Sequence, residues 1–190
     1  MSASWVAADP HFGHVGICKF LAPNGVDKLR PWDDPQEMDE VLVKNWNEVV
    51  HPNDRVNLLG DVAINRRHLI TLGRLNGRIR LIKGNHDIFK LSDYLPYVDD
   101  IAAYHVTKGP AGGKVIMSHI PIHVESLGRF GVNIHGHLHA HTVKRINKDN
   151  QEEVDKRYVC VSVEQTNWRP ITLEEALARA EPTDESAYSH

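Results

Sequence analysis

Three short apolar segments in the first half of the chain alternate with two helix-like segments, and this alternation is the strongest constraint on the fold. Residues 4–8, 55–59 and 78–83 have the composition of buried strands. Between them, residues 34–49 and 65–76 place apolar side chains at helical spacing. The order strand, helix, strand, helix, strand predicts right-handed crossovers between parallel strands. We therefore expect an α/β fold.

The helix-like segments carry their own start and stop signals. Asp34 can cap the first helix, Pro35 suits its first position, and Glu37 would complete a capping box. Gly77 follows the second helix at the position where helices commonly stop. Residues 172–180 begin with the same capping-box spacing, which predicts another short helix.

The second half of the chain is richer in strand-like segments. The candidates are residues 101–106, 114–118, 132–134, 142–146 and 158–163. Residues 147–156 are charged and are expected to form a loop. The chain shows no internal repeat and no linker, so we expect a single domain over residues 1–180. Residues 181–190 are polar and are expected to form a flexible C-terminal tail.

Polar motifs directly follow the strand-like segments at five places. They are Asp9-x-His11, Gly60-Asp61, Gly84-Asn85-His86-Asp87, Ser118-His119 and Gly136-His137-x-His139. In sheets that contain parallel strands, ligands gather at the carboxyl ends of the strands. We therefore expect these segments, remote in sequence, to converge on one edge of the fold.

The side chains of these motifs together form a set of metal ligands. They are Asp9, His11, Asp61, Asn85, His119, His137 and His139. A mixed nitrogen and oxygen set without a thiolate suits Mn²⁺, Fe, Zn²⁺, Ni²⁺ or Co²⁺ better than Mg²⁺ or Ca²⁺. The set is larger than one tetrahedral zinc requires, so we expect two divalent metal ions that share a carboxylate.

Each motif also has a simpler interpretation when it is taken alone. Gly60-Asp61 and residues 84–87 have the composition of ordinary turns, and His119 on an apolar strand can be a core histidine. The turn interpretation explains neither His86 nor the wider pattern of motifs. The metal interpretation is therefore favoured by the series as a whole.

The ordered motifs DxH, GD, GNHD, H and GHxH resemble the signature of the calcineurin-like metallophosphoesterase family, over roughly residues 5–165. The resemblance implies a four-layer sandwich, in which two facing mixed β-sheets are flanked by helices. It also implies a ligand set for each metal. The first metal would be held by Asp9, His11, Asp61 and His139, and the second by Asp61, Asn85, His119 and His137, with Asp61 bridging. Among the metals named above, Mn²⁺ is the one we favour.

The same resemblance implies a mechanism and further site residues. A hydroxide shared by the two metals would attack phosphorus in line. His86 would be a catalytic residue that stabilises or protonates the leaving oxygen, and Asp87 would orient His86 through a hydrogen bond. Apart from the resemblance, His14, which lies near the first motif, and Arg129, which could neutralise phosphate charge, are candidates for substrate contacts. Trp32, in a long loop, is the tryptophan best placed to line a substrate mouth.

The expected substrate is a phosphate ester, nucleotides included. The second motif does not extend to the GDxxDRG pattern of the Ser/Thr protein phosphatases, because Ile64 stands where the second acid would be. We favour phosphodiesters, including cyclic nucleotides. A phosphomonoesterase with the same site is the alternative, and a non-catalytic interaction scaffold with the same fold is the alternative of another class.

Composition argues against several other classes. The net charge of −3 does not suggest a dedicated nucleic-acid-binding protein. Cys18 and Cys160 lie far apart and in no CxxC arrangement, which argues against a zinc finger or a disulfide framework. No apolar stretch approaches the ~18 residues of a membrane span, and residues 1–5 lack a signal-peptide pattern. We therefore expect a cytoplasmic protein without a membrane partner; the sequence predicts no oligomeric state.

Overall fold

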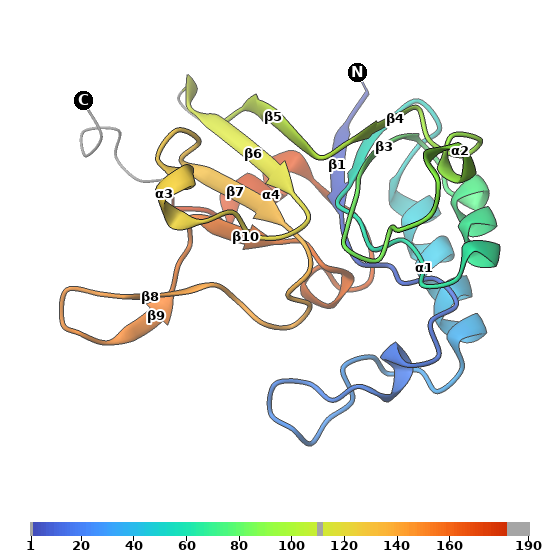
Figure 1. Ribbon diagram of the computed structural model, residues 1–190, viewed down its shortest axis with the longest axis horizontal. Helices are drawn as coiled ribbons and strands as arrows, with labels where there is room; N and C mark the ends of the chain where they lie inside the picture. The colour runs from blue at the N-terminus through green and yellow to red at the C-terminus, as the bar shows by residue number, and fades with distance from the viewer. Residues whose placement is uncertain (1, 110–111, 182–190) are drawn as a thin grey trace.

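The structure is a computed structural model that describes residues 2–109 and 112–181. It contains two mixed β-sheets, a small hairpin and a few helices, which confirms the α/β class (Figure 1). The expected tail falls almost wholly on residues 182–190, which lie outside the described residues. Among the described residues, no helix combines the length and apolar character needed to cross a membrane.

The first sheet has the strand order β11-β1-β2-β3-β4. Its strands are β1 (Ser4–Ala7), β2 (Arg55–Leu58), β3 (Arg78–Ile82), β4 (Asp100–Ala102) and β11 (Ile171–Thr172). Strands β1 to β4 are parallel, with Trp5 opposite Val56 and Val56 opposite Ile79. Strand β11 adds antiparallel to β1. The predicted parallel core of the first half is therefore confirmed.

Helical segments cover one face of the first sheet. They are α1 (Pro35–Val49), the 3₁₀ helix η2 (Arg66–Arg74) and α2 (Leu91–Tyr94). Asp34 caps α1, and its side chain accepts from the N–H of Gln36 at 3.0 Å. The predicted capping box would have it accept from the N–H of Glu37 instead. The second helix-like segment forms a 3₁₀ helix and not an α-helix. Ile70, Thr71 and Gly73 lie inside it, and these residue types have low α-helix propensity.

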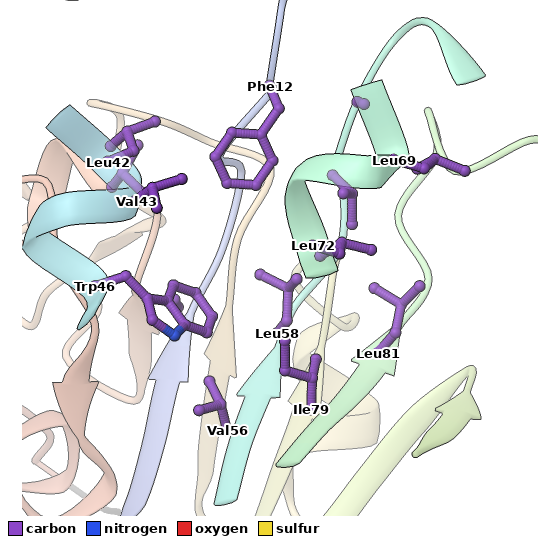
Figure 2. Close-up of a cluster of buried hydrophobic side chains, with 14 of the residues drawn as sticks. Phe12, Leu42, Val43, Trp46, Val56, Leu58, Leu69, Leu72, Ile79 and Leu81 are labelled. Atoms are coloured by element: carbon purple, nitrogen blue, oxygen red, sulfur yellow. The ribbon is translucent and has the colours of Figure 1, made fainter. Parts of the chain in front are cut away.

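An apolar cluster joins these helices to the sheet. Figure 2 shows Leu42 and Trp46 of α1 on one side of the cluster and Leu72 of η2 on the other, with side chains of β2 and β3 between them. The Trp46 indole N–H donates to the backbone oxygen of Asn76 at 2.9 Å, so its polar atom is also satisfied. The helical layer is thus fixed to the outer face of the first sheet.

The second sheet has the strand order β10-β7-β6-β5. Its strands are β5 (Tyr104–Lys108), β6 (Lys114–Ser118), β7 (Val132–His135) and β10 (Tyr158–Cys160). Strands β6, β7 and β10 are parallel, and β5 is antiparallel to β6. The single strand predicted over residues 101–106 is wrong. Ala102 still pairs with Ile82 of the first sheet, whereas Tyr104 pairs with Ser118 of the second.

A hairpin projects from the body of the molecule (Figure 1). It consists of β8 (Lys144–Ile146) and β9 (Glu152–Val154), so the loop predicted over residues 147–156 contains a strand. Arg145 lies opposite Glu153, and Arg145 Nε donates to Glu153 Oε1 at 2.7 Å. Cross-strand pairs of opposite charge stabilise this hairpin. Its strands lack the alternation of apolar and polar residues by which strands are predicted from a sequence.

The two sheets face each other across a second apolar cluster. Its members lie in the strands or directly after them, and they include Val6, Ala8, Leu59 and Ile82 on the side of the first sheet and Met117, Ile134, Val159 and Val161 on the side of the second. Ala7, between Val6 and Ala8, points to the helical layer instead, as the alternation of a strand requires. The molecule therefore has a helical layer, a sheet, a shared core and a second sheet.

The outer face of the second sheet has only slight helical cover in the described chain. The loop before α3 (Val124–Leu127) lies against it, because the Ile122 N–H donates to Asn133 Oδ1 and Tyr158 donates to the Ile122 oxygen. The predicted four-layer sandwich is therefore not confirmed as such. Three further helices are η1 (Ile17–Lys19), η4 (Val163–Gln165) and α4 (Leu173–Ala178). Thr172 caps α4.

Candidate metal centre

The five sequence motifs lie at the carboxyl edges of the two sheets. Asp9 follows β1, Asp61 follows β2, and Asn85 follows β3. On the second sheet, His119 follows β6, and His137 and His139 follow β7. A parallel bridge between Ala8 and Ser162 joins the two edges, and the Val163 N–H donates to the Ala8 oxygen at 3.1 Å. The predicted convergence of distant segments is therefore present.

Two groups of candidate metal ligands form where the edges meet. We call Asp9, His11 and His139 the first ligand group, and Asp61, His119 and His137 the second ligand group. In each group the candidate ligand atoms lie within 4.8 Å of one another. The structure thus has two adjacent sets of possible metal ligands, which is consistent with a dinuclear centre.

The Asp61 carboxylate lies between the two groups. Its Oδ2 is 3.4 Å from His119 Nε2 in the second ligand group and 3.7 Å from His11 Nε2 in the first. Its Oδ1 accepts from the backbone N–H of His86 at 2.8 Å, which fixes the orientation of the carboxylate. Asn85 Oδ1 lies 2.8 Å from His119 Nε2, so the amide adjoins the second ligand group.

Several buried polar atoms of the first ligand group have no hydrogen-bond partner among the described residues. They include Asp9 Oδ1 and both ring nitrogens of His11. Asp9 Oδ1 and His11 Nε2 are 4.0 Å apart. Buried polar atoms are nearly always paired in folded proteins, so an unpaired carboxylate oxygen beside an unpaired imidazole nitrogen fits a cation.

Burial changes the pKa values of these side chains. Burial raises the pKa of the Asp9 carboxyl to about 6 and lowers the pKa of His11 well below its ordinary value. Burial also opposes the charged form of His119, but the carboxylates of Asp61 and Asp9 outweigh it and raise the pKa of that imidazole. His11 is therefore neutral at pH 7, which is the form in which imidazole binds metals.

Five of the predicted ligands have left-handed backbone conformations. Asp9, His11, Asp61, His137 and His139 have φ between 51° and 68°. Such a conformation costs an L-residue roughly 1–2 kcal/mol. Residues held in strained conformations cluster at functional sites, because the surrounding structure must enforce them there. The backbone is thus strained at the places where the side chains converge.

The glycines of the motifs allow the loops to approach one another. A Cβ atom on Gly136 would lie 2.5 Å from Asp9 Oδ2 and 2.6 Å from the Ala8 Cβ. A Cβ atom on Gly84 would overlap the Asp61 carboxylate. Any larger residue would push the motif loops apart.

His86 and Asp87 project to opposite sides of their loop. The His86 side chain is 50% exposed, with Nε2 4.0 Å from Asp61 Oδ2. Asp87 is buried, and its Oδ2 accepts from the backbone N–H groups of Asp61 and Gly84, each at 2.8 Å. Its Oδ1 accepts from the Val62 N–H. The predicted hydrogen bond between Asp87 and the His86 side chain is therefore wrong, because the inward carboxylate binds backbone instead.

The residues predicted to contact substrate lie in three different settings: beside the first ligand group, on the surface and in the core. The His14 ring lies 5.4 Å from the His11 ring, beside the first ligand group. Arg129 is exposed just after α3 and makes no hydrogen bond or ion pair within the described chain, so its role stays a prediction. Trp32 is buried and packs on Trp168 with ring centroids 4.9 Å apart. The expectation that Trp32 lines a substrate mouth is wrong, because the ring belongs to the core.

Three site residues were not predicted from the sequence. Ser162 donates to Asp9 Oδ2 at 2.6 Å, Glu164 Oε1 lies 3.1 Å from His139 Nδ1, and Arg30 contacts Glu164. Ser162 and Glu164 lie at the end of the strand-like segment 158–163, so the criterion that selected the other motifs applies to them too. Arg30 lies in a long loop and carries no such signal.

Comparisons with known proteins find relatives in sequence and in structure, but no matching family profile. The search against protein-family profiles gave no match to this chain. Gene 66 protein of Mycobacterium phage L5 is 36% identical over 92 residues, 46% of this chain and 41% of that protein. The crystal structure of AQ665, a protein of unknown function from Aquifex aeolicus, covers 92% of this chain and 97% of its own, with a TM-score of 0.64 at 22% identity, so the two share a fold.

A full-length relative establishes the family. Uncharacterized protein MJ1445 of Methanocaldococcus jannaschii is 31% identical over 184 residues. The match covers 92% of this chain and 89% of that protein. The chain belongs to the same protein family as MJ1445.

Proposed function

We propose that this protein is a dinuclear-metal-dependent phosphoester hydrolase of the calcineurin-like metallophosphoesterase family, acting preferentially on phosphodiesters, cyclic nucleotides included. One observation carries the proposal: Asp61 Oδ2 lies within 4.0 Å of histidines from both ligand groups. Paired metal sites that clamp a phosphate are a recurrent solution for in-line displacement at phosphorus. A shared carboxylate between two nitrogen and oxygen groups is suited to such a pair.

The residues present fit two divalent cations. The first would be held by Asp9, His11, His139 and Asp61, and the second by Asp61, Asn85, His119 and His137. The unpaired Asp9 Oδ1 and His11 Nε2 support this assignment, because a cation would satisfy both. The mixed donor set favours Mn²⁺ or a neighbouring transition metal. When bound, such a pair lowers the pKa of a water molecule and neutralises phosphate charge.

The protein's own side chains supply proton transfer and positioning. His86 is half-exposed beside Asp61, so its imidazole can reach a bound ester and donate a proton to the leaving oxygen. The Asp87 carboxylate makes no hydrogen bond to the His86 side chain. It ties the backbone of Asp61 to that of Gly84, and so holds the second and third motif loops at a fixed separation. We therefore assign Asp87 a positioning role and His86 the catalytic one.

Exposed apolar side chains next to the motifs support substrates with a large apolar or aromatic part. Ile64, Ile88 and Ile120 follow three different motifs and are 38%, 77% and 51% exposed. Contiguous exposed apolar surface can mark a ligand-binding site, and ligand sites combine apolar lining with a few polar groups. Aryl diesters and nucleotides match this surface better than small alkyl esters do.

The test is a metal analysis combined with a substrate panel. Metal-depleted protein is reconstituted with Mn²⁺, its metal content is measured by mass spectrometry, and turnover is followed on four esters. They are bis(p-nitrophenyl) phosphate, p-nitrophenyl phosphate, and 2′,3′- and 3′,5′-cyclic AMP. Two ions per chain with faster diester hydrolysis is the expected result. Faster monoester hydrolysis would favour the phosphomonoesterase alternative, and metal-replete protein inactive on every ester would favour the scaffold.

A further inference from the structure

Arg30 is fully buried although it lies in the loop between β1 and α1. A buried guanidinium requires both a counter-charge and acceptors for its N–H groups. Arg30 Nε donates to Glu164 Oε1 at 2.8 Å. Its two terminal nitrogens donate to the backbone oxygens of Asp9 at 2.6 Å and Pro10 at 2.8 Å. Arg30 therefore holds the peptide segment that connects Asp9 to His11.

Glu164 contacts the third member of the same group. The oxygen that binds Arg30 also lies 3.1 Å from His139 Nδ1. A hydrogen on Nδ1 donated to this carboxylate leaves Nε2 as the free ligating nitrogen of His139. Carboxylates that bind the far nitrogen of a metal-ligating histidine fix its tautomer and its ring orientation. One ion pair thus contacts the side chain of His139 and the backbone segment that carries Asp9 and His11.

The second ligand group has no comparable ion pair in the described chain. His119 Nδ1 lies 2.7 Å from the Leu59 oxygen, a backbone atom of the neighbouring sheet edge. Asp61 accepts from the His86 backbone N–H. The Arg30–Glu164 pair therefore makes no contact with this group, and its removal should not affect the two groups equally.

We propose, building on the proposed metal centre, that Arg30 and Glu164 are positioning residues that preassemble the first ligand group and thereby set the affinity of one of the two metal sites. Arg30 fixes the Asp9 to His11 backbone, and Glu164 orients the His139 ring. A purely structural role is the alternative, in which the pair only ties the long loop to η4. That role predicts lower stability with no selective effect on either metal.

The experiment measures the two metal affinities separately in the full-length protein. Mn²⁺ is titrated into metal-depleted protein, with calorimetry for the affinities and electron paramagnetic resonance to distinguish single from coupled ions. Glu164→Gln keeps the shape of the side chain but removes its charge. Arg30→Lys keeps the charge but loses the fork that reaches three acceptors. For either variant we expect one site weakened by about 10–100-fold and the other unchanged.

A matched control removes a similar ion pair elsewhere. Asp155 is buried and bonds to Arg157 at 2.6 Å, so Asp155→Asn also strips the charge from a buried carboxylate paired with arginine. We expect this variant to bind both ions as the wild type does. Thermal melting without metal reports any loss of stability in all three variants, and if one site variant does not fold, the other decides.

The possible failures are distinguishable. Wild-type protein that binds fewer than two ions would contradict the proposed function itself. Wild-type protein that binds two ions, together with a folded Glu164→Gln or Arg30→Lys variant that keeps both affinities, would overturn only the positioning role. Equal weakening of both sites would overturn it too, because the contacts of the pair lie with one ligand group alone.

Discussion

The first ligand group is held mainly by side chains of other segments, whereas the second is held mainly by backbone atoms at the strand ends. Asp9 accepts from Ser162, and His139 lies against Glu164. In the second group, Asp61 accepts from a backbone N–H, and His119 lies against a backbone oxygen. The first group therefore depends on particular side chains, and the second on the correct assembly of the strand ends.

This difference predicts which substitutions matter at each group. Backbone partners cannot be removed by changing one side chain, so single substitutions around the second group should act mainly through the ligands themselves. Side-chain partners can be removed one at a time, so the metal affinity of the first group can be lowered in steps. Asp61 is the exception, because it faces histidines of both groups.

The largest expected effect comes from Asp61→Asn, because this substitution should affect both ligand groups at once. The amide keeps the shape of the side chain but loses the charge that both sites share. We expect neither ion to be retained and turnover of bis(p-nitrophenyl) phosphate to fall by about 10³-fold or more. Metal content and activity are measured on the same sample. Asp54→Asn, at a buried aspartate on the opposite edge of the first sheet, should keep both ions. An Asp61→Asn protein that holds two ions would show that this carboxylate is not shared.

His86→Ala separates catalysis from metal binding in both groups. The His86 side chain makes no hydrogen bond among the described residues, so its loss should leave both ions in place. We expect turnover to fall by roughly 10²–10⁴-fold, the usual range for a general acid. Steady-state kinetics with metal analysis tests this, and exposed His51→Ala serves as the control. Full activity in the His86→Ala protein would remove the residue from the mechanism.

Gly136→Ala tests whether close packing between the sheet edges supports the first group. The added Cβ would lie 2.5 Å from Asp9 Oδ2, in a place where the backbone cannot easily move. Overpacking of this kind typically destabilises by about 1–3 kcal/mol. Gly73→Ala is the control, because its Cβ would meet only the edge of the Tyr97 ring at 3.2 Å. Urea denaturation of the metal-free proteins measures both. Equal stability of the two variants would show that the edges can separate without penalty.

The local part of the fold and of the site was predictable from the sequence. Strands β1, β2, β3 and β6 were expected within one residue of their bounds, because apolar runs that end in polar motifs are a short-range signal. The seven candidate ligands came from the same signal. Their convergence needed only the rule that parallel strands present their carboxyl ends together.

The parts that were missed depend on long-range partners. Arg30 and Glu164 are 134 residues apart, and nothing in either local sequence announces the pair. Strand β9 is held by cross-strand charge pairs, which look like a solvated loop when read along the chain. Asp87 was assigned to His86 from the family resemblance, yet neighbours in a loop can face opposite ways. The side-chain network of the first ligand group was thus not visible in the local sequence.

The smallest expected effect is that of Ser162→Ala, which makes a graded change in the first group alone. The Ser162 hydroxyl donates to Asp9 Oδ2 at 2.6 Å, and Asp9 would keep the His137 backbone N–H at 2.9 Å as its other partner. Loss of one hydrogen bond that orients a ligand should weaken one metal site by about 10-fold, at the lower end of such effects. Ser118→Ala removes a comparable hydroxyl beside the second group, but that hydroxyl donates to the Ile120 oxygen and to no ligand, so both affinities should stay unchanged. Mn²⁺ titration of the two variants makes the comparison. If Ser162→Ala weakened both sites alike, the two groups would form one cooperative unit, and the contrast between side-chain and backbone support would have no consequence for metal binding.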